Sequence, residues 1–166
     1  MIALVGVFVL RTIVLTYSWY AYDHVYAGIR RAFATLPAGS ILFSATEDGI
    51  PSLQDLDLRL WQPPLEHAAT LAVLGHDVFV PQTWAKIGQQ SISVTPRYQS
   101  IARYQTPGPL PVTTAEELAS VIAQARKFGE PSMTYLLLLY PNYRNLTWPA
   151  DTRIVATGTD FVLFKL

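Results

Sequence analysis

The first part of the chain is a long apolar run that predicts a membrane-spanning helix. Between Ile2 and Tyr22 the only charged residue is Arg11, and about 20 mostly apolar residues in a helix cross a bilayer core. No Lys or Arg precedes the run, which disfavours a cleaved signal peptide. A buried helix of a soluble fold is the other alternative. A span is favoured because aromatic residues gather at its far end, as at a membrane interface: Tyr17, Trp19, Tyr20 and Tyr22.

The helical pattern continues beyond the apolar run. Apolar residues fall on one stripe with helical spacing, at Tyr22, Val25, Tyr26, Ile29, Phe33 and Leu36. Pro37 and Gly39 then end the helix. The sequence therefore divides into a membrane helix with an amphipathic extension, residues 1–36, and a soluble domain, residues 37–166.

The soluble part alternates short apolar runs with turn residues. Runs bounded by Gly or Pro predict buried strands, at residues 40–46, 76–81 and 133–141, with possible strands at 56–60 and 91–96. Residues 152–166 predict a hairpin that turns at Gly158. The stretch 97–105 is ambiguous, and "TPGPLP" at 106–111 predicts a linker or turn.

Two helices are predicted among these strands. A pair of prolines opens one over residues 63–75, with Gly75 as its C-cap. Thr113 as N-cap and Glu116 three residues later form a capping box for the other, which runs to Phe128. This order indicates the α/β class: an N-terminal membrane helix followed by a small mixed-sheet α/β sandwich, with antiparallel strands at its C-terminal edge.

Composition narrows the possible functions. Hydrophobic residues make up 51% and charged residues 14%, and the formal net charge is zero, so the basic surface typical of nucleic-acid binding is not expected. The chain has no cysteine, which excludes disulfides and thiol nucleophiles. It contains no G-x-S-x-G, G-x-G-x-x-G or Walker A pattern. We therefore predict no catalytic residue, no metal site and no cofactor.

One loop carries residue types that bind sugars. Trp84, Lys86, Gln89 and Gln90 lie together between two apolar runs, and an aromatic ring with nearby amides can stack on a sugar and hydrogen-bond to it. The other interpretation, which the residues favour, is that Gly88 makes a turn and the amides satisfy backbone groups at strand ends. Ligand binding at this loop is a hypothesis.

Two more polar residues interrupt apolar surfaces. His67 lies on the apolar stripe of its predicted helix, where a histidine at the edge of the core is favoured over a ligand-binding one. Arg11 lies in the middle of the predicted span, where a charge costs about 2.5–3.5 kcal/mol and usually faces a bundle interior. We expect Arg11 to pair with a neighbouring membrane helix, although snorkelling is an alternative.

The chain resembles the C-terminal end of polytopic bacterial glycosyltransferase-like membrane proteins of the lipid-linked-sugar type. The resemblance rests on a last membrane span, the amphipathic helix, "LPAGSILF" and "HAATLAVLGHDVFVPQTWAKIGQQSISVTPRY". The resemblance covers about Tyr17 to Tyr98. It implies a bacterial inner-membrane location with the soluble part in the periplasm, whereas Arg30 and Arg31 favour the cytoplasmic side. The catalytic acidic residue of such proteins lies in an early loop between spans, and no position here matches it.

We therefore expect a membrane-anchored extracytoplasmic domain that is non-catalytic by itself. It would be accessory to a glycosyltransferase-like membrane protein in cell-envelope polysaccharide or lipid-linked sugar metabolism. Its expected partners are the membrane, a multi-span protein and a polyprenyl-linked sugar or polysaccharide. One alternative is a protein-interaction or structural module without a carbohydrate role. Another is a small hydrolase that uses acidic residues of one loop: Glu47, Asp48, Asp55 and Asp57.

Overall fold

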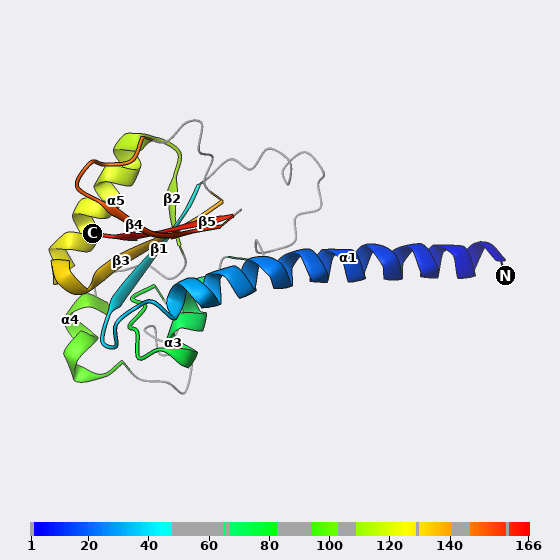
Figure 1. The fold of residues 1–166 in the computed structure, drawn as a ribbon, viewed down its shortest axis with the longest axis horizontal. Coiled ribbons are helices and arrows are strands. Elements are labelled where there is room, and N and C mark those ends of the chain that lie inside the picture. The colour runs from blue at the N-terminus through cyan, green and yellow to red at the C-terminus, as the bar shows by residue number, and fades with distance from the viewer. Residues whose placement is uncertain are drawn as a thin grey trace.

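The computed structural model describes residues 2–47, 65, 67–82, 94–102, 109–128, 130–140, 147–158 and 160–166. A single long helix, α1 (Ile2–Phe33), leads into an α/β domain and extends well beyond it (Figure 1). Every residue from Leu4 to Tyr17 is exposed. Helix α1 is long and apolar enough to cross a membrane, and at 1.5 Å per residue it measures about 48 Å.

The domain is built on a mixed sheet with the strand order β2-β1-β3-β5-β4. The strands are β1 (Ile41–Glu47), β2 (Leu110–Val112), β3 (Thr134–Leu139), β4 (Arg153–Thr157) and β5 (Phe161–Lys165). Strand β1 pairs in parallel with β2 and β3, while β5 is antiparallel to both β3 and β4. The predicted α/β class and mixed sheet are thus confirmed.

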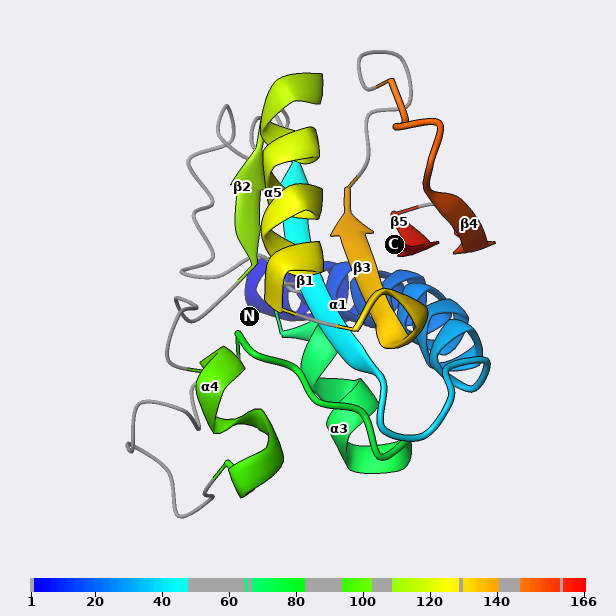
Figure 2. The ribbon, with the colours of Figure 1, turned by 90° about the vertical axis from the view of Figure 1, so that its left-hand side faces the viewer.

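Helices cover both faces of the sheet, as Figures 1 and 2 show from two directions. One face packs against α5 (Ala115–Phe128) and α4 (Gln99–Ala102). The other packs against the C-terminal part of α1, the 3-10 helix η1 (Ala68–Thr70) and α3 (Leu71–Gly75). Side chains of the central strand β3 alternate between these two cores, since successive residues of a strand point to opposite faces.

The end of α1 belongs to the domain core. Ile29 and Phe33 have no exposed surface, and both lie in the cluster that contains Leu137 and Leu163. The predicted apolar stripe beyond the span is therefore confirmed. Helix α1 ends at the predicted breakers, where Gly39 adopts a left-handed backbone with φ of 79° that glycine accepts without strain.

The strongest strand predictions are confirmed. The apolar runs at 40–46 and 133–141 form β1 and β3, and the hairpin at 152–166 forms β4 and β5. These runs are bounded by turn residues and buried on both faces or paired locally, so their pattern alone identifies them. The predicted strand at 56–60 lies outside the described residues.

Strand β2 was not predicted, because its first two residues fall in the stretch 106–111 that we expected to be a linker or turn. Pro111 lies in the middle of β2, and proline within a run argues against a central strand. Strand β2 is an edge strand, where a missing N–H is tolerated. It pairs in parallel with Ala45 to Glu47 of β1, a distant segment that the local sequence of β2 does not indicate.

The predicted strand at 76–81 is wrong. Phe79 forms only an isolated parallel bridge with Ile41, in which the N–H of Leu42 donates to the carbonyl of Phe79 at 2.8 Å. A turn at Pro81 and Gln82 then ends the pairing. The apolar run is nevertheless buried, because Val78 and Val80 lie in the core.

The side chain of Gln82 takes the place of the missing strand. Gln82 is 4% exposed. Its Oε1 accepts the backbone N–H of Ser44 at 2.5 Å, and its Nε2 donates to the Ser44 carbonyl at 2.7 Å. The amide therefore acts like a peptide group of a neighbouring strand, between the Phe79 bridge and β2. It satisfies two backbone groups of β1 that would otherwise be buried without partners.

The remaining predictions before α5 need correction. The possible strand at 91–96 does not form in its described part, because Val94 and Thr95 are irregular and Pro96 begins the 3-10 helix η3 (Pro96–Tyr98). The ambiguous stretch 97–105 contributes the end of η3 and then α4.

The helix predicted over residues 63–75 is shorter than expected. It begins with η1 at Ala68, and Gly75 is its last residue, with His76 as the C-cap. The prolines that we expected to open it lie outside the described residues.

Helix α5 is confirmed, but its capping box lies one residue later than predicted. Thr114 Oγ1 accepts the backbone N–H of Glu117 at 3.2 Å, and Glu117 Oε2 accepts the N–H of Thr114 at 3.3 Å. The same carboxylate also binds the N–H and the hydroxyl of Thr113, each at 2.6 Å. Because Ala115 is the first helical residue, Thr114 is the N-cap and Glu117 is its reciprocal partner.

Replacing Glu117 by glutamine is expected to reduce stability at neutral pH, with the difference vanishing in acid. Hydrogen bonds from Thr113 hold the pKa of Glu117 below its usual 4.5. A carboxyl with a lowered folded-state pKa contributes stability above its unfolded pKa and loses that contribution as the pH falls through the folded one. Denaturant midpoints from neutral to acidic pH measure this. Glu116→Gln is the control and should keep the wild-type acid dependence; a Glu117→Gln difference that is constant with pH would contradict the prediction.

Candidate functional site

The part of α1 that follows the apolar run is surrounded by cavities. Three of them line it, with volumes of about 500, 650 and 390 Å³. Together they bring basic side chains around the helix within a few turns of its interfacial aromatic residues: His24, Arg30, Arg31, His67 and His76. This region, where a membrane-bound chain would leave the bilayer, is the candidate functional site.

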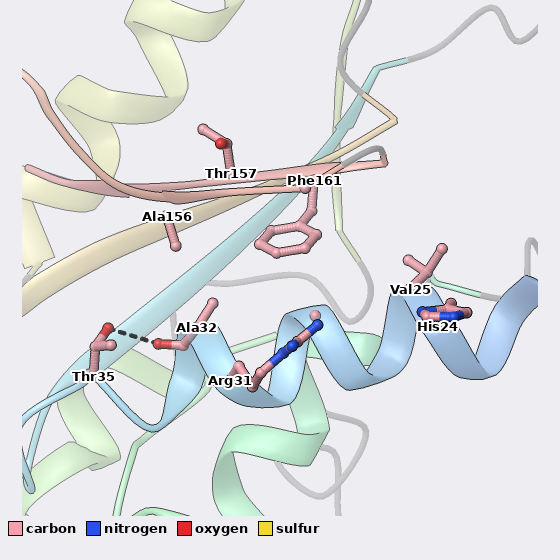
Figure 3. Close-up of a pocket in the computed structure, with 10 residues that line it drawn as sticks. His24, Val25, Arg31, Ala32, Thr35, Ala156, Thr157 and Phe161 are labelled. Atoms are coloured by element: carbon pink, nitrogen blue, oxygen red, sulfur yellow. Dashed lines mark hydrogen bonds between the residues drawn. The ribbon is translucent and has the colours of Figure 1, made fainter.

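The first cavity is a groove between α1 and the β4–β5 hairpin, here named the α1–β4 groove (Figure 3). It is lined by His24, Val25, Gly28, Arg31, Ala32, Thr35, Ala156, Thr157, Gly158 and Phe161. On the strand side, Ala156 and Phe161 point toward α1, whereas the Thr157 side chain points away from it. The groove therefore has an apolar wall on the sheet side and a basic wall on the helix side.

Arg31 lies along the helix surface at this groove. Its Nε donates to the carbonyl of Ala27 at 3.3 Å, so the side chain turns back toward the N-terminal end of α1, as Figure 3 shows. Among the described residues, Arg31 forms no ion pair and no acidic side chain lines the groove. The outer nitrogens of its guanidinium are thus available to an anion.

The second and third cavities lie on other sides of α1, and Asp23 lines both of them. Asp23 lies 3.9 Å from Arg30, an exposed pair whose charges partly cancel. The second cavity also contains His24 and His76, and the third contains His67. Arg31 also lines the second cavity, which therefore holds two arginines and one carboxylate, whereas the third holds one arginine and one carboxylate.

His67 is the one residue of the predicted ligand-binding set that the structure describes. It is exposed beside η1 and faces the third cavity together with Asp23, Tyr26 and Arg30, rather than lying on the core side of its helix. Trp84, Lys86, Gln89 and Gln90 lie outside the described residues.

The described part of the chain contains no candidate metal-binding cluster. No three side chains of His, Cys, Asp or Glu gather closely enough there to hold a metal ion. Of the acidic loop considered for hydrolysis, Glu47 ends β1, while Asp48, Asp55 and Asp57 lie outside the described residues.

Arg11 is exposed in the middle of the apolar part of α1. Two polar neighbours are satisfied within the helix, since the Thr12 hydroxyl donates to Phe8 and the Ser18 hydroxyl to Val14, each at 2.9 Å. The described ion pairs are Arg30–Asp23 and Arg126–Asp151. Arg11 therefore has no charged partner in the described chain.

The α1–β4 groove was not anticipated from the sequence. His24 and Arg31 are seven residues apart and so share a helix face, a signal that was present in the sequence. Ala156 and Phe161, which form the opposite wall, lie more than a hundred residues later in the chain, so the sequence pattern does not indicate that they face this part of α1. Comparisons of the chain with protein-family models, with curated proteins and with solved structures found no match.

Proposed function

We propose that this protein is a membrane-anchored α/β domain that acts as a non-catalytic accessory part of a larger membrane protein assembly. The observation that carries the proposal is Arg11, which is exposed and has no charged partner among the described residues, on an apolar helix long enough to span a bilayer. A charge at mid-membrane costs about 2.5–3.5 kcal/mol, and such residues usually pair inside a bundle. A second membrane helix with an acidic side chain would supply that partner.

The continuity of α1 supports a mechanical role for this pairing. The same helix carries Arg11 in its apolar part and buries Ile29 and Phe33 in the domain core. An uninterrupted helix fixes the domain close to the partner's membrane surface, because no linker separates the span from the core. The domain would thus be held in one orientation over the assembly.

The role in lipid-linked-sugar or cell-envelope polysaccharide metabolism rests on the resemblance to glycosyltransferase-like membrane proteins. The proposed location of the domain on the periplasmic side of the bacterial inner membrane rests on the same resemblance. These two proposals assign a substrate class and a compartment to the anchored domain. A structural module without a carbohydrate role would use the same pairing of Arg11 and differs only in lacking glycan binding. A C-terminal reporter tests the side: activity of a cytoplasmic reporter alone would contradict the periplasmic location.

Arg11→Leu is expected to abolish pairing of the span while preserving membrane insertion, and Arg11→Lys is expected to retain pairing. A photo-crosslinking residue at Val14 lies on the Arg11 face, one turn away, whereas one at Ile13 lies on the opposite face and serves as the control. In native membranes, the Val14 probe should crosslink to a membrane helix that carries Asp or Glu. Crosslinking that is equal from both positions, or that persists in Arg11→Leu, would refute the proposal.

A further inference from the structure

We propose that the α1–β4 groove binds the phosphate of an anionic membrane lipid. The inference rests on the membrane-anchored part of the proposed function, and it is independent of the pairing of Arg11. It assigns a ligand to a cavity of about 500 Å³ that joins a basic wall, carrying Arg31 and His24, to an apolar wall with Phe161 and Ala156.

The position of the groove along α1 matches the lipid headgroups. The apolar run Ile2–Tyr22 is about 31 Å long as a helix, close to the ~30 Å of a bilayer core. His24 begins the groove directly after this run, and Arg31 lies about two turns further. Because Arg31 Nε bonds to Ala27, the guanidinium reaches back toward the membrane. Both basic side chains thus lie at or near the headgroup region.

The chemistry of the groove matches an amphiphilic phosphate. A guanidinium offers parallel N–H donors that bind two oxygens of one phosphate, and only the Nε of Arg31 has a described partner. The ring of Phe161 and the methyl groups of Ala32 and Ala156 line the remainder of the cavity. Ala156 is partly exposed and would contact the apolar part of a lipid next to its headgroup, which a small soluble anion does not need, whereas Phe161 and Ala32 are buried beneath it.

Several backbone features keep this space open. The β4–β5 pairing contains a register shift between Ile154 and Ala156, and a local break in strand pairing bends the strand and redirects its side chains. A Cβ on Gly28 would lie 3.2 Å from the Phe161 ring, and a Cβ on Gly158 would overlap that ring. Small residues on both walls therefore let the Phe161 ring form the apolar floor of the groove.

The absence of a carboxylate among its described lining residues distinguishes this groove from the other two cavities. Asp23 lines both of those cavities, and its carboxylate would repel a phosphate. No acidic side chain of the described residues lines the α1–β4 groove. Arg30 and Arg31 differ although they are adjacent: Arg30 lies near Asp23 and lines the second and third cavities, whereas Arg31 lines the α1–β4 groove as well as the second cavity.

The test uses the full chain in nanodiscs that contain phosphatidylcholine and phosphatidylglycerol. Native mass spectrometry then identifies the lipid that stays bound when the protein is released from the nanodisc. We expect preferential retention of one phosphatidylglycerol. Arg31→Gln should weaken this retention about tenfold, as expected for loss of a charge-assisted pair. Arg30→Gln removes the same charge from the neighbouring position and should have little effect. Ala156→Leu keeps all charges but fills the groove, and should also weaken retention.

Three outcomes would overturn the inference. Equal losses for Arg30→Gln and Arg31→Gln would show nonspecific attraction to the basic surface. Absence of any preference for phosphatidylglycerol in the wild-type chain would show that the groove holds no such lipid. Displacement of the bound lipid by excess inorganic phosphate would assign the groove to a soluble phosphoryl ligand. Since no partner protein is present, each of these outcomes leaves the pairing of Arg11 to be judged by its own crosslinking test.

Discussion

Replacing Gln82 by alanine is expected to lower the free energy of unfolding by about 2–6 kcal/mol. The side-chain amide of Gln82 binds both the N–H and the carbonyl of Ser44 inside the domain, and Ser44 is 2% exposed. Each buried backbone group left without a partner costs about 1–3 kcal/mol. Alanine would leave two such groups in the middle of β1.

Gln82→Glu separates hydrogen bonding from packing, because it keeps the shape of the side chain. A carboxylate can still accept the Ser44 N–H, but it has no donor for the Ser44 carbonyl. We expect Gln82→Glu to be destabilising as well. Denaturant unfolding in detergent measures both variants, with Gln124→Ala on the exposed face of α5 as the control. A loss below about 0.5 kcal/mol, the usual range for surface substitutions, would show that the amide does not support β1.

Phe33→Ala is expected to cost about 3–5 kcal/mol, the usual range for a large aromatic side chain removed from a core. Phe33 has no exposed surface, and it packs in the cluster formed by α1, η1, α3 and the sheet. Its loss would leave a cavity between the helix and β3. Such a loss would detach the end of α1 from the domain and remove the rigid connection on which the proposed function depends.

A matched control for this variant lies in the same helix. Phe8 is 67% exposed and lies in the apolar part that would contact lipid, so Phe8→Ala should leave the stability of the domain unchanged. Unfolding in detergent, followed by near-UV circular dichroism, reports on the domain for both variants. Equal effects of the two substitutions would contradict the assignment of Phe33 to the core.

Most elements with a strong local pattern could be predicted. Strand β3 is an uninterrupted apolar run, and α5 has a polar face, a capping sequence and a basic last turn, so each carries its signal within its own residues. The predicted cap of α5 was one residue too early, because two threonines are followed closely by two glutamates and either threonine satisfies the sequence pattern. The hydrogen bond from the N–H of Glu117 to Thr114 Oγ1 identifies Thr114 as the cap.

The predictions that failed depend on partners far away in the chain. Strand β2 has only three residues, one of them a proline, and it forms because it pairs in parallel with the edge of β1. Residues 76–81 have a strand-like pattern, yet a turn at Pro81 limits their pairing to a single bridge. The sequence pattern favours backbone hydrogen bonding for Gln89 and Gln90, which lie outside the described residues. Gln82, for which the sequence predicts no role, forms such bonds with Ser44.

The sequence by itself determined the long apolar helix with Arg11, the helical stripe that follows it and the α/β class. Each of these features produces a pattern among residues that are close together along the chain. The tertiary structure decided the rest of the site. Arg31 becomes one wall of a groove only because β4 and β5, more than a hundred residues later, pack against α1. Such contacts follow from burial and strand pairing between distant segments, which a periodic pattern does not encode.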